Sequence, residues 1–431
     1  METPSIAVNE SEKAHSLISA SQLNLLDIPP HDPPPDGGLW AWLQVIVMFF
    51  GTWNSWGIIN IFGVYQEYYQ THLLQGTSTE KISWIGTIAG ALIYFGAVAV
   101  GPLIDLGYVK HMVLVSAFLQ SFAFMMLSLS TKYYQIILCQ GICSGLAASI
   151  AFVCGVGSVG TWFHKRRSLA VGFGAMGSAF GGVVYSVTAR NLLKTVGFAW
   201  SARIIGFLVL CTQFVAFLCC KSRLPPRKSG GYYDYNAYKE PKMMTMTWAL
   251  TLGNMGAYIF YFYAQTFGLT KLKSVNPNLM IYTTAILNAG SVPGRLLPNF
   301  LAMRSGPVTI FTICLFVTSI LTWFWLMADT MGSFLTIACL YGFFTGPVVS
   351  LPAPAVASFT PDLTKLGMRL AFLYVHAGVG MLVGPPMAGI MIRQHAWKYG
   401  IIYAGCLCTL GAVLGLTCRQ ICTKWRIWGK A

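Results

Sequence analysis

The sequence predicts an all-α membrane protein with twelve transmembrane helices in two six-helix halves. Three observations support this prediction: long apolar stretches, few charged residues, and one polar interruption near the middle of the chain. Of the 431 residues, 55% are hydrophobic and only 10% are charged, whereas an ordinary soluble domain carries about 25% charged residues. The chain therefore has too few polar residues to cover a surface that faces water, and a lipid bilayer is the solvent that suits it.

Twelve apolar segments follow one another after a polar start. Each is long enough to cross a hydrocarbon core, and each must be helical because lipid offers the backbone no hydrogen bonds. The polar loop 221–242 separates the segments into two sets of six, which predicts an N-terminal half, 39–220, and a C-terminal half, 243–418. The predicted spans are 40–66, 82–104, 111–130, 135–162, 168–193, 200–220, 243–267, 278–301, 307–327, 332–358, 368–392 and 398–418.

The segments outside the spans predict the orientation. Residues 1–38 are polar and rich in proline, without the basic start and apolar core of a signal peptide, so we expect a disordered cytoplasmic tail. Of the 28 lysines and arginines, 18 fall on the side of the N-terminus, 9 on the other side, and Arg295 lies within a span. By the positive-inside rule, the loop 221–242, the basic tail 419–431 and both termini are then cytoplasmic. Asn9, in a glycosylation-type sequence, should stay unmodified there.

The net charge and the cysteines suggest no further partner. The formal charge is +15, but the basic residues sit in short loops between apolar runs, as membrane topology requires, and we expect no nucleic-acid partner. Nearly all twelve cysteines lie inside apolar stretches, and none has the spacing with histidine that a zinc site needs. We expect free thiols, no metal and no cofactor.

Arg295 is the one charge that we place near the middle of a span. An arginine at the centre of a membrane helix costs about 2.5–3.5 kcal/mol, so it should face a wet cavity or a partner. A guanidinium in a cavity is a good receptor for a carboxylate or another anion. Asn288 and Ser291 precede it at spacings that place all three residues on one helical face. The alternative is an arginine that bonds to backbone carbonyls at a kink.

Other polar and aromatic residues within the spans are further candidates. Trp53, Trp56 and Asn60 recur at helical spacing in the first span, which is compatible with a substrate path and equally with packing between helices. His376 in the eleventh span is able to exchange a proton near neutral pH, or it serves as a hydrogen-bonded core histidine.

A short motif after the second span predicts a conformational latch. Gly101, Asp105 and Gly107 form a GxxxDxG pattern just before basic residues. A carboxylate at the end of a helix can cap a neighbouring helix and bridge to basic loop residues, which stabilises one conformation. The alternative is an ordinary polar turn.

Five motifs resemble the monocarboxylate porter family, in particular its fungal branch. The resemblance covers nearly the whole chain beyond residue 35. It implies a major facilitator fold, alternating access between the two halves, and substrates that are often organic anions. The motifs are Asp36 to Trp42, Trp53 to Tyr69, Trp162 to Gly172, Leu287 to Arg295, and Val383 to Gly389.

The resemblance carries over to single residues only in part. Arg295 matches the substrate-binding arginine of the family's eighth helix. Ser291 stands where proton-linked animal members carry an acid, and Asn60 stands where they carry an essential lysine. Arg304 keeps part of a second latch, while Met303 replaces the acid before it. These departures argue against proton-coupled lactate or pyruvate transport, and the family's fungal members include carriers of riboflavin and proposed exporters of secondary metabolites.

We therefore expect a secondary active transporter that moves an organic anion, monocarboxylate-like or a related metabolite, by alternating access. The alternatives are an exporter of a larger secondary metabolite or a riboflavin-type carrier, and a non-transporting membrane sensor. A membrane enzyme is disfavoured, because the sequence offers no nucleophile–base set, metal cluster or phosphate loop. The expected partners are a small anionic molecule, the lipid bilayer and, as an open question, a coupling proton. The expected location is the plasma membrane, with the vacuolar membrane as the alternative.

Overall fold

The computed structural model describes residues 34–223, 233–272, 276–280, 282–360 and 365–424. Residues 36–431 form one unit, separate from residues 1–35. The predicted N-terminal tail up to residue 33, including Asn9, lies outside the described residues, as do 224–232 of the central loop and 425–431 of the basic tail.

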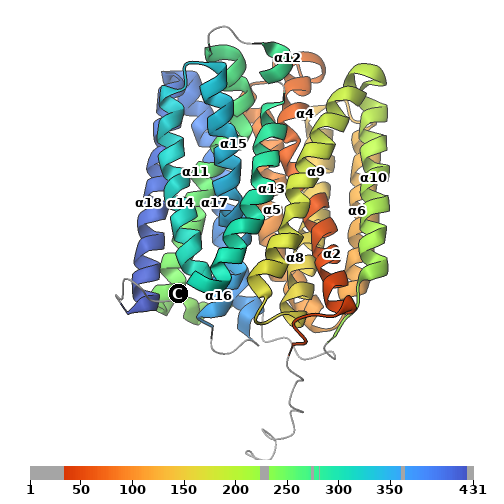
Figure 1. Ribbon diagram of the computed structural model, residues 1–431. Coiled ribbons are helices and arrows are strands. Elements are labelled where there is room, and N and C mark those ends of the chain that lie inside the picture. The colour runs from red at the N-terminus through yellow and green to blue at the C-terminus, as the bar shows by residue number, and fades with distance from the viewer. Residues whose placement is uncertain (1–33, 224–232, 273–275, 281, 361–364, 425–431) are drawn as a thin grey trace, which may run out of the picture. The chain divides into compact units, whose positions relative to one another are not determined.

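The regular elements of the described residues are helices throughout (Figure 1). We call the elements before the central loop the N-half and those after it the C-half. The N-half comprises α2 (Leu39–Asn54), α3 (Trp56–Asn60), α4 (Phe62–Tyr68), η1 (Tyr69–Leu73), α5 (Thr79–Asp105), α6 (Val109–Leu127), α7 (Tyr133–Ile136), η2 (Ile137–Cys143), α8 (Ser144–Trp162), α9 (Arg167–Thr195) and α10 (Gly197–Cys219). The C-half comprises α11 (Pro241–Lys271), α12 (Pro277–Met280), α13 (Thr283–Ser305), α14 (Pro307–Phe324), η4 (Trp325–Met327), α15 (Met331–Ser350), α16 (Pro352–Ser358), α17 (Leu366–His395) and α18 (Trp397–Thr423), preceded by the short η3 (Tyr235–Lys239).

These elements form twelve spans in two sets of six, which confirms the predicted fold. Ten spans are long and apolar enough to cross a membrane by length and composition, and α2 to η1 together count as one of them, Leu39–Leu73. The other two, α11 and α13, have 31 and 23 residues, and a helix of about 20 residues already crosses the hydrocarbon core. Several of their polar side chains are buried inside the protein, among them Asn254 on α11 and Asn288 on α13.

Successive spans run in opposite directions, so the bundle has two distinct ends. At the terminal end, α2 begins and α18 finishes, and η3 and α16 lie there too; α12 and the junction of η1 with α5 lie at the opposite end (Figure 1). Arg295 has nearly equal lengths of α13 on either side, which places it about midway between the two ends.

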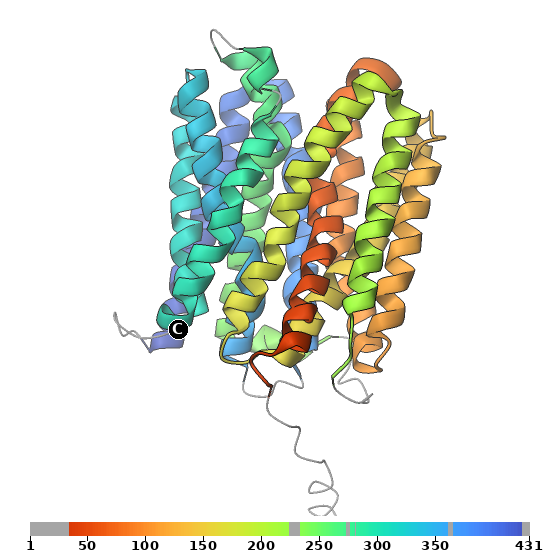
Figure 2. The same ribbon diagram turned by 45° about the vertical axis from the view of Figure 1, so that its right-hand side comes forward.

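The two halves stand side by side in Figure 2. Contact between them runs chiefly through two helix pairs, α9 with α13 and α5 with α17. Glycines permit the close approach of α9 and α13: a Cβ on Gly172 would lie 2.7 Å from the carbonyl oxygen of Arg295. A Cβ on Gly182 would likewise lie 2.6 Å from the amide carbon of Asn288. Small residues thus bring one face of the N-half directly onto the helix that carries Arg295.

Local sequence explains where helices end. Gly107 has φ +85°, its N–H donates to the carbonyl of Ile104, and the N–H of Tyr108 donates to that of Leu103. This is the Schellman arrangement, which satisfies carbonyl groups at a helix end and favours glycine. Gly306, with φ +90°, separates α13 from α14, and Pro307 follows it at the first position of the next helix.

Candidate functional site

The first span is interrupted where it passes the centre of the bundle. Ser55, between α2 and α3, has φ −95° and ψ −82°, and Ile61 separates α3 from α4. The one-turn segment α3 between them carries Trp56 at its start and Asn60 at its end. Discontinuous helices at mid-membrane depth are typical of substrate sites in secondary transporters, because irregular backbone is tolerated there only beside protein or a cavity.

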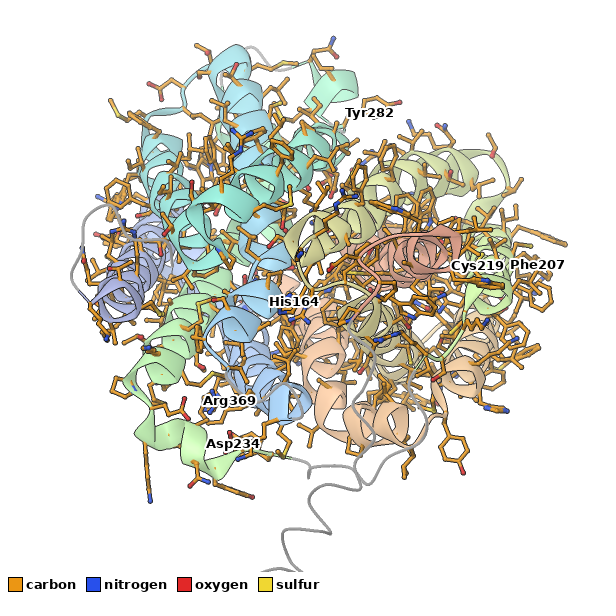
Figure 3. All side chains as sticks on the ribbon, turned by 60° about the horizontal axis from the view of Figure 1, so that its bottom comes forward. His164, Phe207, Cys219, Asp234, Tyr282 and Arg369 are labelled. Carbon is orange, nitrogen blue, oxygen red and sulfur yellow. The ribbon has the colours of Figure 1, made fainter. Side chains whose placement is uncertain are left out.

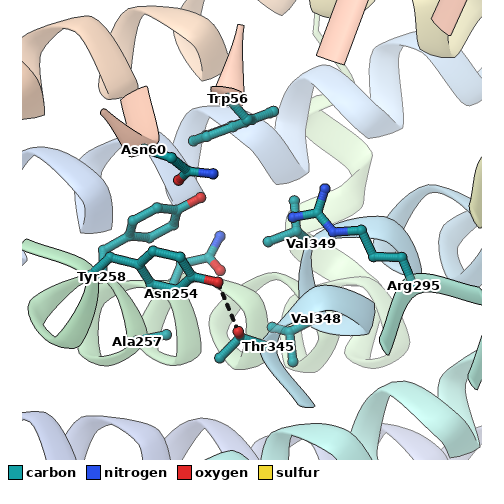
Figure 4. Close-up of a pocket in the computed structure, with 10 residues that line it drawn as sticks. Trp56, Asn60, Asn254, Ala257, Tyr258, Arg295, Thr345, Val348 and Val349 are labelled. Atoms are coloured by element: carbon teal, nitrogen blue, oxygen red, sulfur yellow. Dashed lines mark hydrogen bonds between the residues drawn. The ribbon is translucent and has the colours of Figure 1, made fainter. Parts of the chain in front are cut away.

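A pocket lies between the two halves beside this segment (Figure 4). Figure 4 shows the Arg295 side chain on one side of it, with Trp56, Asn60 and Tyr258 on the other. The lining comes from α3 in the N-half and from α11, α13 and α15 in the C-half, so movement of the halves must change its shape. The lining residues are Trp56, Asn60, Asn254, Ala257, Tyr258, Tyr261, Arg295, Thr345, Val348 and Val349.

The pocket is narrow in this conformation. The space that the centre of a water molecule can occupy is about 10 Å³, which corresponds to about one water. An organic molecule therefore enters only when the halves separate. The side chains around the central site thus nearly fill it in this conformation.

Arg295 joins the halves and also lines the pocket. Its side chain is 4% exposed, and its guanidinium donates to the carbonyl of Ala175 and the hydroxyl of Ser178, both on α9. Its Nε is buried and has no hydrogen-bond acceptor. Among the residues that the structure describes, no carboxylate lies within ion-pair distance of this guanidinium. Arg295 thus lines a cavity and also bonds to a backbone carbonyl of the other half, and its role in substrate binding stays a prediction.

Asn60 and Asn288 bridge the two halves next to Arg295. The Asn60 amide donates to Oδ1 of Asn288 at 2.8 Å, and the Asn288 amide donates to the carbonyl of Thr284 at 2.9 Å. Asn60 lines the pocket, whereas Asn288 is fully buried behind it. Ser291 is fully buried too, and its hydroxyl has no hydrogen-bond partner. It does not line the described pocket.

Aromatic rings make up much of the pocket wall. Trp56 stacks on Tyr258 across the halves, with ring centroids 5.8 Å apart, and it also contacts Tyr94 in a tilted arrangement, with centroids 4.9 Å apart. The indole Nε1 of Trp56 is buried without an acceptor. Tyr261 shares a hydrogen bond of 3.0 Å with Thr345, the dashed line in Figure 4. These rings offer flat apolar surfaces, and the unpaired indole offers a hydrogen-bond donor.

Two further pockets continue the central one toward both ends. Toward the end of the bundle where α12 lies, a second pocket shares Asn60, Tyr258 and Tyr261 with the central one, and Gly63 also lines it. Toward the terminal end, another shares Trp56, Arg295 and Val349 with it. The three pockets form a row along the boundary between the halves. Such a row is the arrangement that a path through the protein requires.

Two predicted site residues lie away from this row. Trp53 packs against Tyr185, with ring centroids 6.0 Å apart, and does not line the described pockets. His376 lies in the first half of α17, toward the terminal end. Its Nδ1 is 2.8 Å from the carbonyl oxygen of Phe372, and its Nε2 is 3.4 Å from the hydroxyl of Tyr238. Tyr238 belongs to the short helix η3, so His376 contacts the segment that leads into the C-half.

The predicted latch residues have different surroundings. Gly107 ends α5 as described above, and a Cβ on Gly101 would meet no atom within 4 Å. The side chain of Asp105 lies outside the described part of the structure. Arg304 is exposed near the terminal end and sits over the ring of Phe300, 6.0 Å from its centroid. A latch between these residues stays a prediction.

Carboxylates connect the halves at the opposite end, and sequence reasoning missed them. Glu67 on α4 accepts from Arg190 on α9 at 3.2 Å and from Gln265 on α11, in the other half, at 2.7 Å. Glu80 on α5 forms an ion pair of 2.8 Å with Arg393 on α17. The expected first span ended at residue 66, whereas the helical segment extends to Leu73, so Glu67 was placed in a loop.

At the terminal end, the described carboxylates do not bridge the two halves; Asp234 and Glu240, which flank η3, join the central loop to the C-half. Arg369 pairs with Asp234 at 3.3 Å and with Glu240, and Figure 3 shows Arg369 and Asp234 near one another on this face. Asp36 accepts from the backbone N–H groups of His164 and Lys165, at 2.6 and 2.8 Å. One ion pair, Glu80 with Arg393, and one hydrogen bond, Gln265 to Glu67, thus connect the halves at one end of the row of pockets. We find no matching contact between carboxylates and the other half at the terminal end among the described residues.

Comparison with known proteins identifies this architecture. The profile of the Major Facilitator Superfamily matches residues 41–297 and 243–420, which together span most of the chain. The chain belongs to the major facilitator superfamily.

Relatives within the superfamily are fungal transporters. The chain is 36% identical over 372 residues to the MFS-type transporter dbaD of Emericella nidulans, covering 85% of this chain and 84% of that protein. It is 30% identical over 417 residues to the aspyridones efflux protein apdF of the same organism, covering 96% of this chain and 84% of that protein. It is 35% identical over 401 residues to MFS-type transporter 1 of an Ophiocordyceps species, covering 90% and 88%.

This major facilitator protein is thus an integral, multi-pass membrane transporter, as expected from the sequence. Alternating access of two halves around a central site is the mechanism of such folds. The pocket beside the interrupted first span, with polar groups from both halves, has the position that this mechanism requires. The narrower assignment to the monocarboxylate porter family goes beyond these comparisons, because the relatives are named only as transporters or efflux proteins.

Proposed function

We propose that this transporter exports an acidic secondary metabolite, an organic anion with a flat apolar body, through the central pocket. The observation that carries the proposal is the guanidinium of Arg295, which lines the pocket, is almost fully buried, and has no carboxylate within ion-pair distance among the described residues. A buried cation without a counter-ion is costly. An anionic substrate in the opened pocket would supply that counter-ion.

The unpaired donors of the pocket support an acceptor-rich substrate. Arg295 Nε and Trp56 Nε1 are both buried without acceptors, and neither group is able to accept a hydrogen bond. A carboxylate or enolate oxygen would satisfy both kinds of donor, and a charge-assisted hydrogen bond is stronger than a neutral one. A cationic substrate would meet an uncompensated positive charge at the same place.

The aromatic wall supports a larger substrate than a simple monocarboxylate. Trp56, Tyr258 and Tyr261 present rings to the pocket, and such rings gain from contact with flat apolar surfaces. The chain resembles the monocarboxylate porters, whose proton-linked animal members carry a lysine where this chain has Asn60. A second fixed cation for a small carboxylate is therefore missing at this position. The name of the aspyridones efflux protein, which is similar over nearly the whole chain, supports export of a secondary metabolite.

In this proposal, the terminal end faces the cytoplasm and the protein sits in the plasma membrane. The N-half, 39–220, and the C-half, 243–418, rock about the pocket, with the loop 221–242 and the tails 1–38 and 419–431 in the cytoplasm. Substrate enters from the terminal end, pairs with Arg295, and leaves when the contacts at the opposite end separate. We do not include a coupling proton in the pocket, because no carboxylate lines it among the described residues.

A second candidate function is export of a neutral metabolite, with Arg295 serving structure. The hydrogen bonds from Arg295 to Ala175 and Ser178 favour it, because they give the guanidinium partners on α9 without any substrate. A riboflavin-type carrier belongs with this alternative. The two candidates differ in the charge of the exported compound.

Metabolite profiling with an Arg295 variant separates these candidates. Medium and cell contents are compared for the producing fungus with and without the gene, and for strains that carry Arg295→Gln or the control Arg203→Gln. Arg203 is half-buried on α10, bonds to Ser128 and lies outside the pocket. We expect an acidic compound to remain in the cells without the gene, and Arg295→Gln to reduce its export about tenfold or more, the effect of losing one hydrogen bond to a charged group.

The control variant and the nature of the compound decide the outcome. Arg203→Gln should leave export unchanged. Export of only neutral compounds, or full export of the acidic compound by Arg295→Gln, would contradict the proposed role of Arg295 and favour the second candidate.

A further inference from the structure

A network of buried polar side chains surrounds the end of α2, one residue before the interruption of the first span. At its centre lies Asn54, which is fully buried. Polar groups in the middle of an apolar bundle are costly unless they are all paired. The pocket does not include Asn54, so the site described above does not account for this network.

Asn54 uses every hydrogen-bonding group that it has outside the helix. Its amide nitrogen donates to Gln213 Oε1 at 2.9 Å and to Thr212 Oγ1 at 3.0 Å, both on α10. Its side-chain oxygen accepts from the hydroxyl of Tyr185 on α9 at 2.6 Å. Its backbone carbonyl accepts from the amide of Gln120 on α6 at 2.5 Å. One residue thus ties α2 to three other helices of the N-half.

A second layer holds these partners in place. The Gln213 amide donates to the hydroxyl of Ser116 on α6 at 2.9 Å, and that hydroxyl donates to the carbonyl of Val113 at 2.8 Å. Gln120, Gln213 and Tyr185 are each no more than 1% exposed. Of these side chains, Gln120 keeps one buried oxygen, Oε1, without a hydrogen-bond partner. The hydrogen bonds nevertheless fix Asn54 from several sides, which makes it a poor candidate for free rotation.

The network acts on the residues that follow it. Ser55, with its unusual backbone angles, comes directly after Asn54, and the hydroxyl of Ser55 donates to the carbonyl of Gly51 at 2.8 Å. The direction of α3 depends on how the chain leaves this point. Trp56 and Asn60, both on α3, line the pocket, so a change at Asn54 would move them relative to Arg295 on the opposite half.

We propose that Asn54 is a positioning residue, which with Gln120, Gln213 and Tyr185 holds the interruption of the first span so that Trp56 and Asn60 face the substrate. The role of Asn54 in selectivity rests on the proposed function of the pocket. Its role in placing Asn60 does not, because it follows from the hydrogen bonds alone.

A matched control exists on the same helix. Gln44, ten residues earlier, is also a fully buried amide of α2, and it also connects to the end of α10, where it donates to the carbonyl of Cys219 at 3.1 Å. Gln44 lies near the terminal end of α2, about three helical turns before the interruption. Asn54→Ala and Gln44→Ala thus remove similar groups from one helix, and only the first is next to α3.

The experiment measures the reactivity of a cysteine at position 60 and needs no substrate. Asn60→Cys is introduced alone and together with Asn54→Ala or Gln44→Ala, and the purified full-length protein in nanodiscs is treated with N-ethylmaleimide. Peptide mass spectrometry measures labelling at position 60 separately from labelling of the native cysteines. We expect Asn54→Ala to change the labelling rate about fivefold, the shift that one net hydrogen bond gives to a conformational equilibrium. Gln44→Ala should leave the rate unchanged.

A second variant covers the case in which Asn54→Ala does not fold. Gln120→Leu keeps the size of the side chain and removes only the bond to the Asn54 carbonyl, and it should change the labelling rate in the same direction. Unchanged labelling in Asn54→Ala or, where that variant does not fold, in Gln120→Leu would overturn the proposal, as would an equal change in Gln44→Ala.

The export assay distinguishes this proposal from the proposed function. In the producing strain, Asn54→Ala should alter the ratio in which two exported acidic compounds appear in the medium, while Gln44→Ala lowers both equally or neither. If labelling changes as expected but Arg295→Gln has no effect on export, the positioning role holds and the substrate assignment of the pocket fails.

Discussion

Asp36 shows what a single residue contributes at the terminal end. It has φ +53°, and its carboxylate accepts from three successive backbone N–H groups, those of His164, Lys165 and Arg166, just before α9 begins. Partial burial alone would raise the pKa of Asp36, but these hydrogen bonds outweigh it and hold the pKa below its ordinary value. The acidic residue just before the first span thus holds the loop that leads into α9, a contact that the sequence motif did not predict.

The depressed pKa of Asp36 predicts a pH-dependent contribution to stability. A group whose pKa is lower in the folded protein stabilises it above the unfolded pKa, about 3.9 for aspartate, and this contribution is lost as pH falls through the folded pKa. Asp36→Ala should therefore lower the melting temperature at pH 7, with a loss of about 1 kcal/mol, the usual net value of an intramolecular hydrogen bond. The difference from wild type should shrink as the pH falls to 4 and below. A difference that grows toward acid pH would contradict this role.

The sequence alone points to a candidate site residue where a charged residue stands within an apolar span. Arg295 was identified because it is a charge within an apolar span, and the structure places it at the pocket. Asn254 lines the same pocket, but it was missed because uncharged polar residues are common within spans and only the fold shows which way they face. Tyr258 lines it too, whereas the sequence favoured an interfacial aromatic belt for this residue. The carboxylates Glu67 and Glu80 were missed because both lie near predicted span ends, where polar residues need no explanation.

At the scale of elements, the contact between α9 and α13 depends on glycine. A Cβ on Gly172 would lie 2.7 Å from the carbonyl oxygen of Arg295 and 2.9 Å from Cβ of Asn299, so the helices would have to separate. Gly160, near the end of α8, would meet nothing within 4 Å. These two glycines therefore differ in what a single methyl group would do.

We predict opposite effects for alanine at these two positions. Alanine favours a helix by about 1 kcal/mol over glycine, but overpacking a tight contact costs about 1–3 kcal/mol. Gly160→Ala should leave the melting temperature unchanged or raise it, whereas Gly172→Ala should lower it and reduce export, because it forces apart the two halves beside Arg295. Thermal unfolding in detergent and the export assay measure both effects. Equal behaviour of the two variants would show that the contact tolerates separation.

The elements themselves were the most predictable part of the fold. Apolar length and helical backbone pairing in lipid leave few alternatives, so all twelve spans were found, with ends displaced by a few residues. The interruptions at Ser55 and Ile61 were not predicted, because neither proline nor glycine stands at these positions. The break at Ser55 lies beside hydrogen bonds from distant helices, to which local sequence gives no clue.

For the whole molecule, the contacts between the halves differ between the two ends of the row of pockets. At the opposite end, Glu80 with Arg393 and Glu67 with Gln265 connect the halves. The ion pair is partly open to water, because the Arg393 side chain is 63% exposed while the Glu80 side chain is 12% exposed. Exposed ion pairs contribute about 0.2–1 kcal/mol, so we expect a small contribution from this pair. Weak contacts suit a gate, because the halves must separate there once in each transport cycle.

If the ion pair of Glu80 with Arg393 helps to hold this end closed, then removing or swapping its charges should change how often this end opens. A cysteine at Gly63, which lines the pocket nearest this end and would meet no atom within 4 Å, reports opening through its labelling rate in nanodiscs. Glu80→Gln should raise that rate about two- to fivefold, as loss of an exposed ion pair allows. The pair Glu80→Arg with Arg393→Glu should restore the wild-type rate. No rise in Glu80→Gln would mean that this ion pair does not hold the end closed.

The most direct test of the central claim is a cryo-EM structure of the protein with the exported compound identified by metabolite profiling. The account predicts density for the compound between the two halves, with an acidic group against the guanidinium of Arg295 and an apolar body against Trp56 and Tyr258. A bound compound elsewhere, with Arg295 still bonded to Ala175 and Ser178 and no ligand atom near it, would contradict the account.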